Sequence, residues 1–209
     1  MRNSGIFSYG MRMVWHRGAW IPPLVVAAYV LFRYQGALTG DWLPLFEVFL
    51  PFFSVVYVVP VMVGDKEAGI WPLILSYPVD RTLLFVSKML PALVMALLLP
   101  WFAWGVIRVL GVSLAMETLL YTLPGLLFLT GLSAIASVAA PHAAAAYLFP
   151  LGWWALDLST RGLITRTFYL FAASYPQQGI DMGATKWMLS TAGILLWCGA
   201  AACFHRIRP

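Results

Sequence analysis

Long apolar runs, separated by short polar stretches, dominate the hydropathy pattern of this 209-residue chain. Several runs approach the roughly 20 residues that a helix needs to cross the hydrocarbon layer of a membrane. They do not alternate between apolar and polar positions as barrel strands do, and in lipid each run must satisfy its own backbone hydrogen bonds. We therefore predict an all-α integral membrane protein with about six transmembrane helices, at residues 19–38, 42–63, 89–110, 118–139, 143–158 and 187–204.

The composition of the chain agrees with this pattern. Hydrophobic residues make up 62% and charged residues 10%, with a mean hydropathy of +0.84. Soluble domains carry about 25% charged residues, and a chain this short cannot bury so much apolar surface in water. The net charge of +5 comes from Lys and Arg at the ends of apolar runs. No basic run is interleaved with polar residues, so we expect membrane lipid and no nucleic acid as a partner.

Two segments of the single predicted domain, 1–209, are expected to lie at the membrane surface. Residues 1–18 place Phe, Met, Val and Trp on one helical face among basic residues, which predicts an amphipathic interfacial helix. A frayed tail is the alternative, and no cleavable signal peptide is evident. Residues 159–186 form the second segment. Their apolar part, 163–175, is too short to cross and contains Arg166, so we interpret it as an external re-entrant or interfacial piece.

The basic residues also predict the orientation. Six spans place both termini on one side of the membrane. Cytoplasmic segments carry an excess of Lys and Arg, and eight basic residues fall on the side of the termini against five on the other. We therefore expect a multi-pass plasma-membrane protein with both termini in the cytoplasm. The eight residues are Arg2, Arg12, Arg17, Lys66, Arg81, Lys88, Arg206 and Arg208.

Motifs for catalysis and nucleotide binding are absent from the sequence. It contains no G-x-x-x-x-G-K-[ST] loop, no G-x-S-x-G and no H-E-x-x-H. Cys198 and Cys203 match no metal spacing and are expected to pack in the last helix. We predict no catalytic residue, no metal site and no cofactor bound by this chain, and we do not expect an enzyme.

Two carboxylates lie within or beside the predicted spans. An acidic residue inside an apolar run, such as Glu47, is costly and is therefore a candidate functional group. Glu47 also closely follows Pro44, so it fits the first helical turn at the interface, where the helix dipole favours a negative charge. Asp157 has Arg161 four residues later, which predicts an ion pair at a helix end, with a substrate contact as the alternative.

The longest charged interruption in the first half of the chain is 64–88, GDKEAGIWPLILSYPVDRTLLFVSK. Apolar residues follow its first charged cluster at helical spacing, with Pro72 suited to a first turn and Pro78 to a stop. We predict a short helix outside the bilayer, between the second and third spans, that offers one face to a partner. Its apolar residues are Ile70, Leu73, Ile74 and Tyr77.

This stretch resembles the membrane subunits of ABC-2-type exporters. Those permeases carry an acidic and basic cluster after the second span, a glycine, a leucine-rich turn, Pro-Val-Ser-Arg and a lysine entering the third span. The chain departs from that pattern at Ile70-Trp71, where the family often has Thr-Leu, at Pro72, and at Asp80 in place of serine. The matching residues are Asp65, Lys66, Glu67, Gly69, Leu73, Leu75, Pro78, Val79, Arg81 and Lys88.

The resemblance implies a mechanism and partners. The stretch 64–82 would be a cytoplasmic coupling helix that docks in a groove of a separate ATPase subunit. Two permeases, identical or different, and two ATPases would form the exporter, with ATP and Mg bound by the ATPases. The alternative is an ion-coupled secondary transporter that uses Glu47. The sequence does not predict the identity of the substrate. The resemblance implies ATPase docking by Asp65, Lys66, Glu67, Gly69, Ile70, Leu73, Ile74, Tyr77, Pro78 and Arg81.

Overall fold

The computed structural model describes residues 20–35, 41–76 and 80–207. These residues form helices and connecting turns and contain no strand, which confirms the all-α prediction. Helix η1 is a π-helix and η2 is a short 3-10 helix. In chain order the elements are α2 (Ile21–Gln35), η1 (Leu45–Phe49), α3 (Leu50–Glu67), α4 (Trp71–Ser76), α5 (Arg81–Val109), α6 (Glu117–Ala139), α7 (Ala143–Thr160), η2 (Arg166–Phe168) and α8 (Met182–Arg206).

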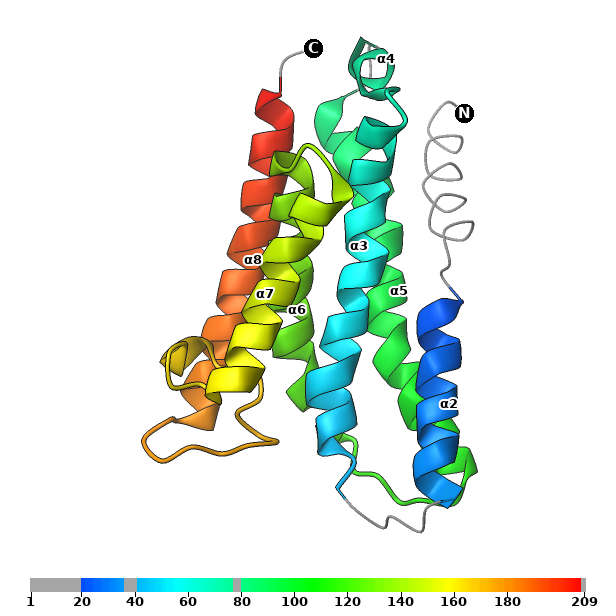
Figure 1. Cartoon of the computed structure of the whole chain (residues 1–209), viewed down its shortest axis with the longest axis vertical. Coiled ribbons are helices and arrows are strands. Elements are labelled where there is room, and N and C mark those ends of the chain that lie inside the picture. The colour runs from blue at the N-terminus through cyan, green and yellow to red at the C-terminus, as the bar shows by residue number, and fades with distance from the viewer. Residues whose placement is uncertain (1–19, 36–40, 77–79, 208–209) are drawn as a thin grey trace.

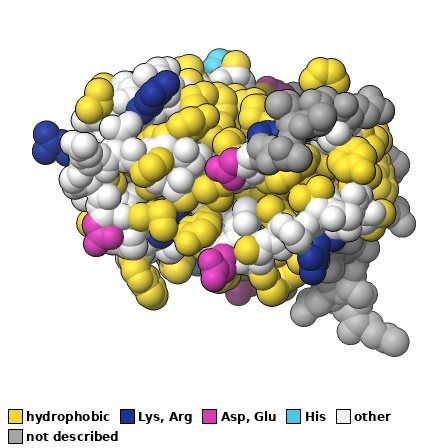
Figure 2. Space-filling model, turned by 90° about the horizontal axis from the view of Figure 1, so that it is seen from below, with side chains coloured by type: hydrophobic (Ala, Val, Ile, Leu, Met, Phe, Trp, Pro, Cys, Tyr) yellow, Lys and Arg dark blue, Asp and Glu magenta, His cyan; other side chains and the backbone are white. Residues whose placement is uncertain are grey.

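The long helices run side by side along the long axis of the molecule (Figure 1). Helix α4 and the C-terminal end of α8 lie at one end of this bundle, which we call the α4 end. The connection 161–181, which contains η2, lies at the opposite end, which we call the loop end. Charged side chains are scattered among apolar ones at the loop end (Figure 2). The two ends therefore present different polar structures, one built around α4 and one around the connection.

Within the described residues, four helical runs are long and apolar enough to cross a membrane: Leu45–Glu67, Arg81–Val109, Glu117–Ala139 and Met182–Arg206. The first of them combines η1 and α3. Helix α2 is apolar but has only 15 residues. The chain is therefore a membrane-embedded helical protein, whereas the count of six spans stays a prediction.

Two helices begin earlier than the sequence predicted, because each starts at an aspartate that caps it. The Asp80 carboxylate accepts a hydrogen bond from the Thr82 amide at 2.8 Å, so α5 begins at Arg81 instead of residue 89. The Asp181 carboxylate accepts one from the Gly183 amide at 2.9 Å at the start of α8. An aspartate in this position satisfies an amide that the first turn leaves without a helical partner. The apolar runs therefore mark only the inner parts of these helices.

Helices α6 and α8 cross where each has a glycine. A Cβ atom on Gly131 would lie 2.6 Å from the carbonyl oxygen of Gly193. A Cβ on Gly193 would lie 2.6 Å from the carbonyl carbon of Leu127. The two backbones approach this closely only because neither position carries a side chain, as in other membrane helix pairs. The glycine contact fixes how α8 lies against the more deeply buried α6.

Several sequence predictions fall on residues outside the described ranges. They are the interfacial helix at 1–18 with its three arginines, the end of the first span at 36–38, the matching residues Tyr77, Pro78 and Val79, and Arg208.

Candidate functional site

The charged cluster at the end of α3 lies partly inside the protein. Asp65 is fully buried and forms an ion pair with Lys88 of α5, which is itself 2% exposed. The Trp71 ring of α4 lies beside this pair, with its centroid 5.9 Å from the Lys88 ammonium nitrogen. The pair therefore joins α3 to α5 directly beneath α4. Lys88, expected at the entrance to the third span, is instead an interior residue within α5.

Lys66, the neighbour of Asp65, holds the end of another helix. Its ammonium donates hydrogen bonds to the carbonyl oxygens of Ser137, Val138 and Ala140, at 2.8, 2.7 and 2.8 Å. Helix α6 ends at Ala139, so these carbonyls include some that have no partner within the helix. A cation at this place also faces the negative end of the helix dipole. Lys66 thereby links the end of α3 to the turn between α6 and α7.

Glu67 and Arg81 make similar contacts with two further helix ends. The Glu67 carboxylate accepts a hydrogen bond at 2.8 Å from the amide of Ala143, the first residue of α7. The Arg81 guanidinium donates to the carbonyl oxygens of His205 and Ile207 at the end of α8. The charged residues around α4 therefore connect α3 and α5 to α6, α7 and α8. Because these side chains already have partners within the chain, they are less available to bind another protein than the sequence pattern alone suggested.

Helix α4 itself has an inner and an outer side. The inner side carries Trp71, whose ring packs edge-on against Phe204 of α8 with 5.6 Å between ring centroids. The outer side carries Leu73, which is 62% exposed, while Ile70 and Ile74 are half-buried. Gly69 precedes the helix with a φ of 68°, a left-handed conformation that glycine adopts without strain. The chain thus turns at Gly69 and presents an exposed leucine at the end of the bundle.

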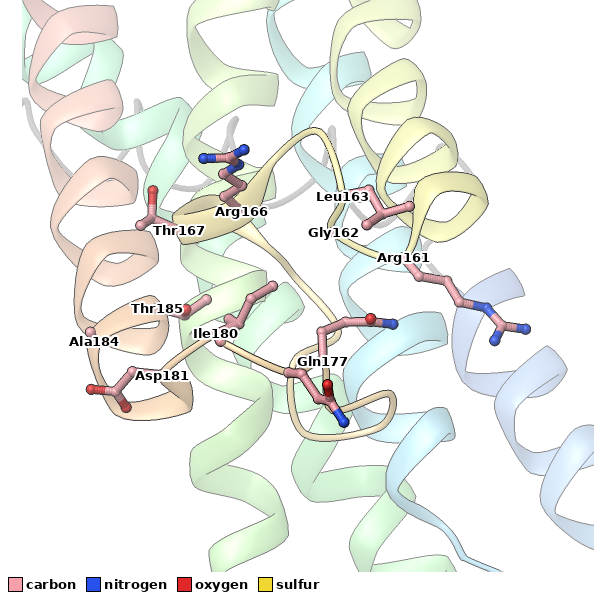
Figure 3. Close-up of a pocket in the computed structure, with 12 residues that line it drawn as sticks. Arg161, Gly162, Leu163, Arg166, Thr167, Gln177, Ile180, Asp181, Ala184 and Thr185 are labelled. Atoms are coloured by element: carbon pink, nitrogen blue, oxygen red, sulfur yellow. The ribbon is translucent and has the colours of Figure 1, made fainter.

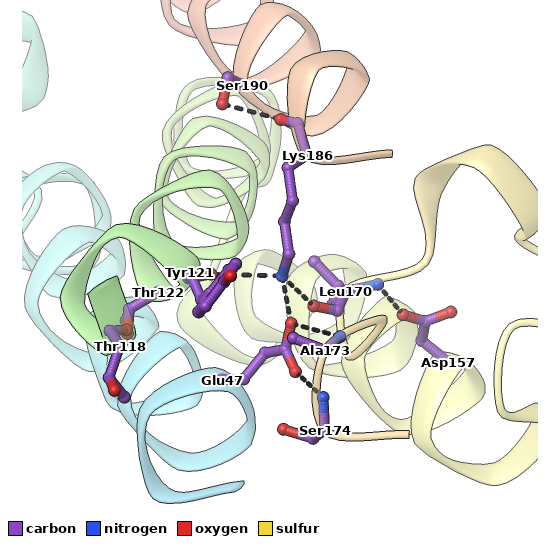
Figure 4. A network of polar contacts seen from close by, with 10 residues as sticks. All are labelled: Glu47, Thr118, Tyr121, Thr122, Asp157, Leu170, Ala173, Ser174, Lys186 and Ser190. Atoms are coloured by element: carbon purple, nitrogen blue, oxygen red, sulfur yellow. Dashed lines mark hydrogen bonds and ion pairs between the residues drawn. The ribbon is translucent and has the colours of Figure 1, made fainter. Parts of the chain in front are cut away.

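At the loop end, Glu47 forms the centre of a second buried network (Figure 4). This residue lies in η1, is 1% exposed and pairs with Lys186 of α8. Its carboxylate also accepts hydrogen bonds from the amides of Ala173 and Ser174 in the connection. Lys186 additionally donates to the carbonyl oxygen of Tyr121 at 3.2 Å. This network joins η1, α6 and α8 to the connection, and the Lys186 ammonium neutralises the Glu47 carboxylate.

The Asp157 carboxylate holds the connection from α7. It accepts hydrogen bonds from the Thr165 hydroxyl and the Leu170 amide. The predicted ion pair with Arg161 is wrong, because Arg161 ends α7 in a left-handed conformation and lies over the Tyr175 ring at 5.9 Å. The helix does not continue to the position where a four-residue spacing would bring the two charges together.

The middle of the connection folds back against the bundle. Tyr169, Leu170 and Phe171 are fully buried, and the Tyr169 hydroxyl has no hydrogen-bond partner among the described residues. Burial, reinforced by the carboxylates of Asp157 and Glu47, raises the pKa of the Tyr169 phenol above its ordinary value. This side chain is therefore a neutral part of the core. The apolar segment 163–175 supplies core residues without forming a long helix of its own.

Sequence reasoning missed two important partners, Lys186 and Thr165. Lys186 was expected outside the last span, and α8 begins before it. A capping pattern at Asp181 was the signal that would have placed Lys186 one turn inside that helix. Nothing in the sequence pointed to the pairing of Thr165 with Asp157.

Comparison of the chain with protein-family models and with curated proteins finds no match. Among the described residues, no group of three or more His, Cys, Asp or Glu side chains is placed to hold a metal ion. The arrangement of the two polar clusters is therefore the basis for a functional argument.

Proposed function

We propose that this chain is the membrane-spanning permease subunit of an ATP-driven ABC-type exporter. In this proposal, α4 is the coupling helix that docks on a separate ATPase subunit, which binds ATP and Mg. Two ATPase copies and a second permease, identical or different, complete the transporter. The α4 end and both termini face the cytoplasm, and six helices cross the plasma membrane.

The observation that carries the proposal is the placement of α4. It protrudes at the end of a membrane-embedded bundle and exposes Leu73, while its inner side is held by Trp71 (Figure 1). The side chains of Lys66, Glu67 and Arg81 join the same region to the ends of α6, α7 and α8. A force applied to α4 by a partner would therefore act on several membrane helices together. This is the mechanical requirement for a subunit that takes its energy from another protein.

Binding of an ATPase subunit tests the proposal. The full chain is co-purified with an ATPase encoded beside it, and complex formation and ATP turnover are measured for Leu73→Asp. We expect both to fall at least tenfold, because a charge replaces an apolar contact in the docking surface. Met116→Asp is the matched control, since Met116 is 60% exposed just before α6 at the loop end. If Leu73→Asp forms the complex as well as the wild type, α4 is not the docking element.

The ion-coupled transporter that uses Glu47 receives less support. A coupling carboxylate must exchange protons with water, whereas Glu47 is 1% exposed and is paired with Lys186. Substrate flux that follows a proton gradient without any ATPase, and that is lost in Glu47→Gln, would establish this alternative.

A further inference from the structure

A cavity of about 520 Å³ opens at the loop end, between the turn 161–168 and the start of α8 (Figure 3). Polar side chains from both parts of its wall line it together with a few aliphatic ones. None of the functions discussed above uses this cavity. Its polar lining includes Arg161, Arg166, Thr167, Gln177, Asp181 and Thr185.

The charges at the cavity favour an anion. Arg166 is exposed, and its guanidinium forms no ion pair with any other described residue. Among the described residues of the lining, Asp181 is the only acidic one, and one of its carboxylate oxygens accepts a hydrogen bond from the Gly183 amide at the start of α8. The lining therefore carries two arginines and one aspartate, a net positive charge. A guanidinium presents several donors in a plane, which suits the oxygens of a phosphate group.

The residues beside the cavity indicate that such a phosphate belongs to a lipid headgroup. Leu163 and Ile164 stand between the two arginines and are 75% and 64% exposed. Two adjacent exposed aliphatic side chains with flanking arginines suit the boundary between acyl chains and headgroups, where the apolar residues enter lipid and the cations remain at the phosphates. Trp187 is also exposed near the start of α8, and tryptophan is enriched at this depth.

We propose that this cavity binds the phosphate of an anionic phospholipid headgroup, with Arg166 as the principal cation and Leu163 and Ile164 in the adjoining acyl layer. Binding there would fix the turn 161–168 at the membrane surface. The same turn leads into the buried residues Tyr169–Phe171, so a bound lipid would also hold the connection against the bundle. The proposal is independent of any ATPase partner.

The test uses the purified full chain in phosphatidylcholine nanodiscs that contain a small fraction of spin-labelled phosphatidylglycerol. The measured quantity is the fraction of label that the protein immobilises. A basic residue near an anionic surface contributes about 1 kcal/mol, so Arg166→Gln should weaken the preference for phosphatidylglycerol about fivefold. Arg166→Lys keeps the charge and should retain most of that preference. Arg108→Gln is the control, because Arg108 lies at the end of α5 over Trp104 and outside the cavity lining.

Three results would overturn the proposal. The first is that Arg166→Gln keeps the wild-type preference for phosphatidylglycerol. The second is that Arg108→Gln loses as much of this preference as Arg166→Gln does. The third is that inorganic phosphate displaces the labelled lipid or stabilises detergent-purified protein through Arg166 as strongly as phosphatidylglycerol does, which would make free phosphate the ligand. Thermal unfolding of each variant in detergent separates lost binding from lost folding. A retained preference in Arg166→Lys together with an unfolded Arg166→Gln would still support the charge-based site.

Discussion

Glu47 and Asp65 lie near opposite ends of one helical run, and each buried carboxylate pairs with a lysine from another helix: Glu47 with the partly buried Lys186, and Asp65 with the buried Lys88. At about 1.5 Å per residue, the two positions are separated by roughly 27 Å along the axis. This separation is close to the ~30 Å thickness of the hydrocarbon layer. The two ion pairs therefore fit the two boundaries of that layer, where polar groups of the bundle can lie near water and headgroups. Between them, α3 presents mainly apolar residues.

The Glu47–Lys186 pair should matter most when only one partner is removed. Lys186→Met leaves the Glu47 carboxylate buried without its cation, so we expect the free energy of unfolding to fall by about 3 kcal/mol. The double variant Glu47→Gln with Lys186→Met removes both charges and should recover a large part of the loss. Thermal unfolding in detergent, compared across the wild type and both variants, measures the effect. A double variant as unstable as Lys186→Met alone would contradict this account of the pair.

The sequence predicted the helices better than their contacts. The boundaries of the expected spans 118–139 and 143–158 differ by at most two residues from those of α6 and α7. The agreement is close because an apolar run in lipid must satisfy its own backbone hydrogen bonds and therefore forms a helix. The partner of Glu47 could not be predicted, since Lys186 is 139 positions away and is brought close only by the packing of α8. The predicted Asp157–Arg161 ion pair was also wrong. It assumed that the helix continues for four more residues, whereas α7 ends at Thr160.

The role of α4 illustrates the same limit. The sequence placed a short helix between charged residues, and the structure has one at Trp71–Ser76. The pattern could not show that Lys66 and Glu67 contact the turn between α6 and α7, because those contacts span more than 70 positions. Residues whose sequence pattern predicts a docking surface can therefore also make contacts within the chain.

Lys66 should hold the α6–α7 turn in place. Lys66→Gln removes the cation that contacts three carbonyl oxygens, and the shorter amide side chain cannot reach all of them. We expect a loss of about 1–3 kcal/mol in stability, the usual cost of leaving buried polar groups unpaired. Amide hydrogen exchange at 140–146 should become faster. Arg206→Gln serves as the comparison, because Arg206 is exposed at the last turn of α8; equal exchange in both variants would exclude a specific role for Lys66.

The contact between α6 and α8 gives a prediction with a control on the same helix. Gly193→Ala places a Cβ within 2.6–2.8 Å of the backbone at Leu127 and Phe128, so α8 must move away from α6. Overpacking of this kind costs about 1–3 kcal/mol. Gly199→Ala places its Cβ 3.7 Å from the Cδ1 atom of Ile135, which is ordinary contact, and should be neutral or slightly stabilising. Unfolding midpoints in one detergent compare the two, and equal midpoints would mean that α6 and α8 are not in close contact at the glycines.

Gly162 and Gly179 allow backbone strain to be separated from a steric clash. Both have left-handed backbones, with φ of 78° and 81°. A Cβ on Gly162 would lie 2.6 Å from the Cγ atom of the buried Tyr169 ring, whereas a Cβ on Gly179 would have no atom within 4 Å. Gly179→Ala should therefore cost only the strain of a non-glycine residue in this conformation, about 1 kcal/mol. Gly162→Ala carries the same strain and also displaces Tyr169 from the core, so its total loss should exceed that of Gly179→Ala by at least about 1 kcal/mol. Chemical unfolding of the two variants under identical conditions measures the difference. Equal losses would show that the turn 161–168 does not press against Tyr169, and the connection would then not be held in the bundle in the way described.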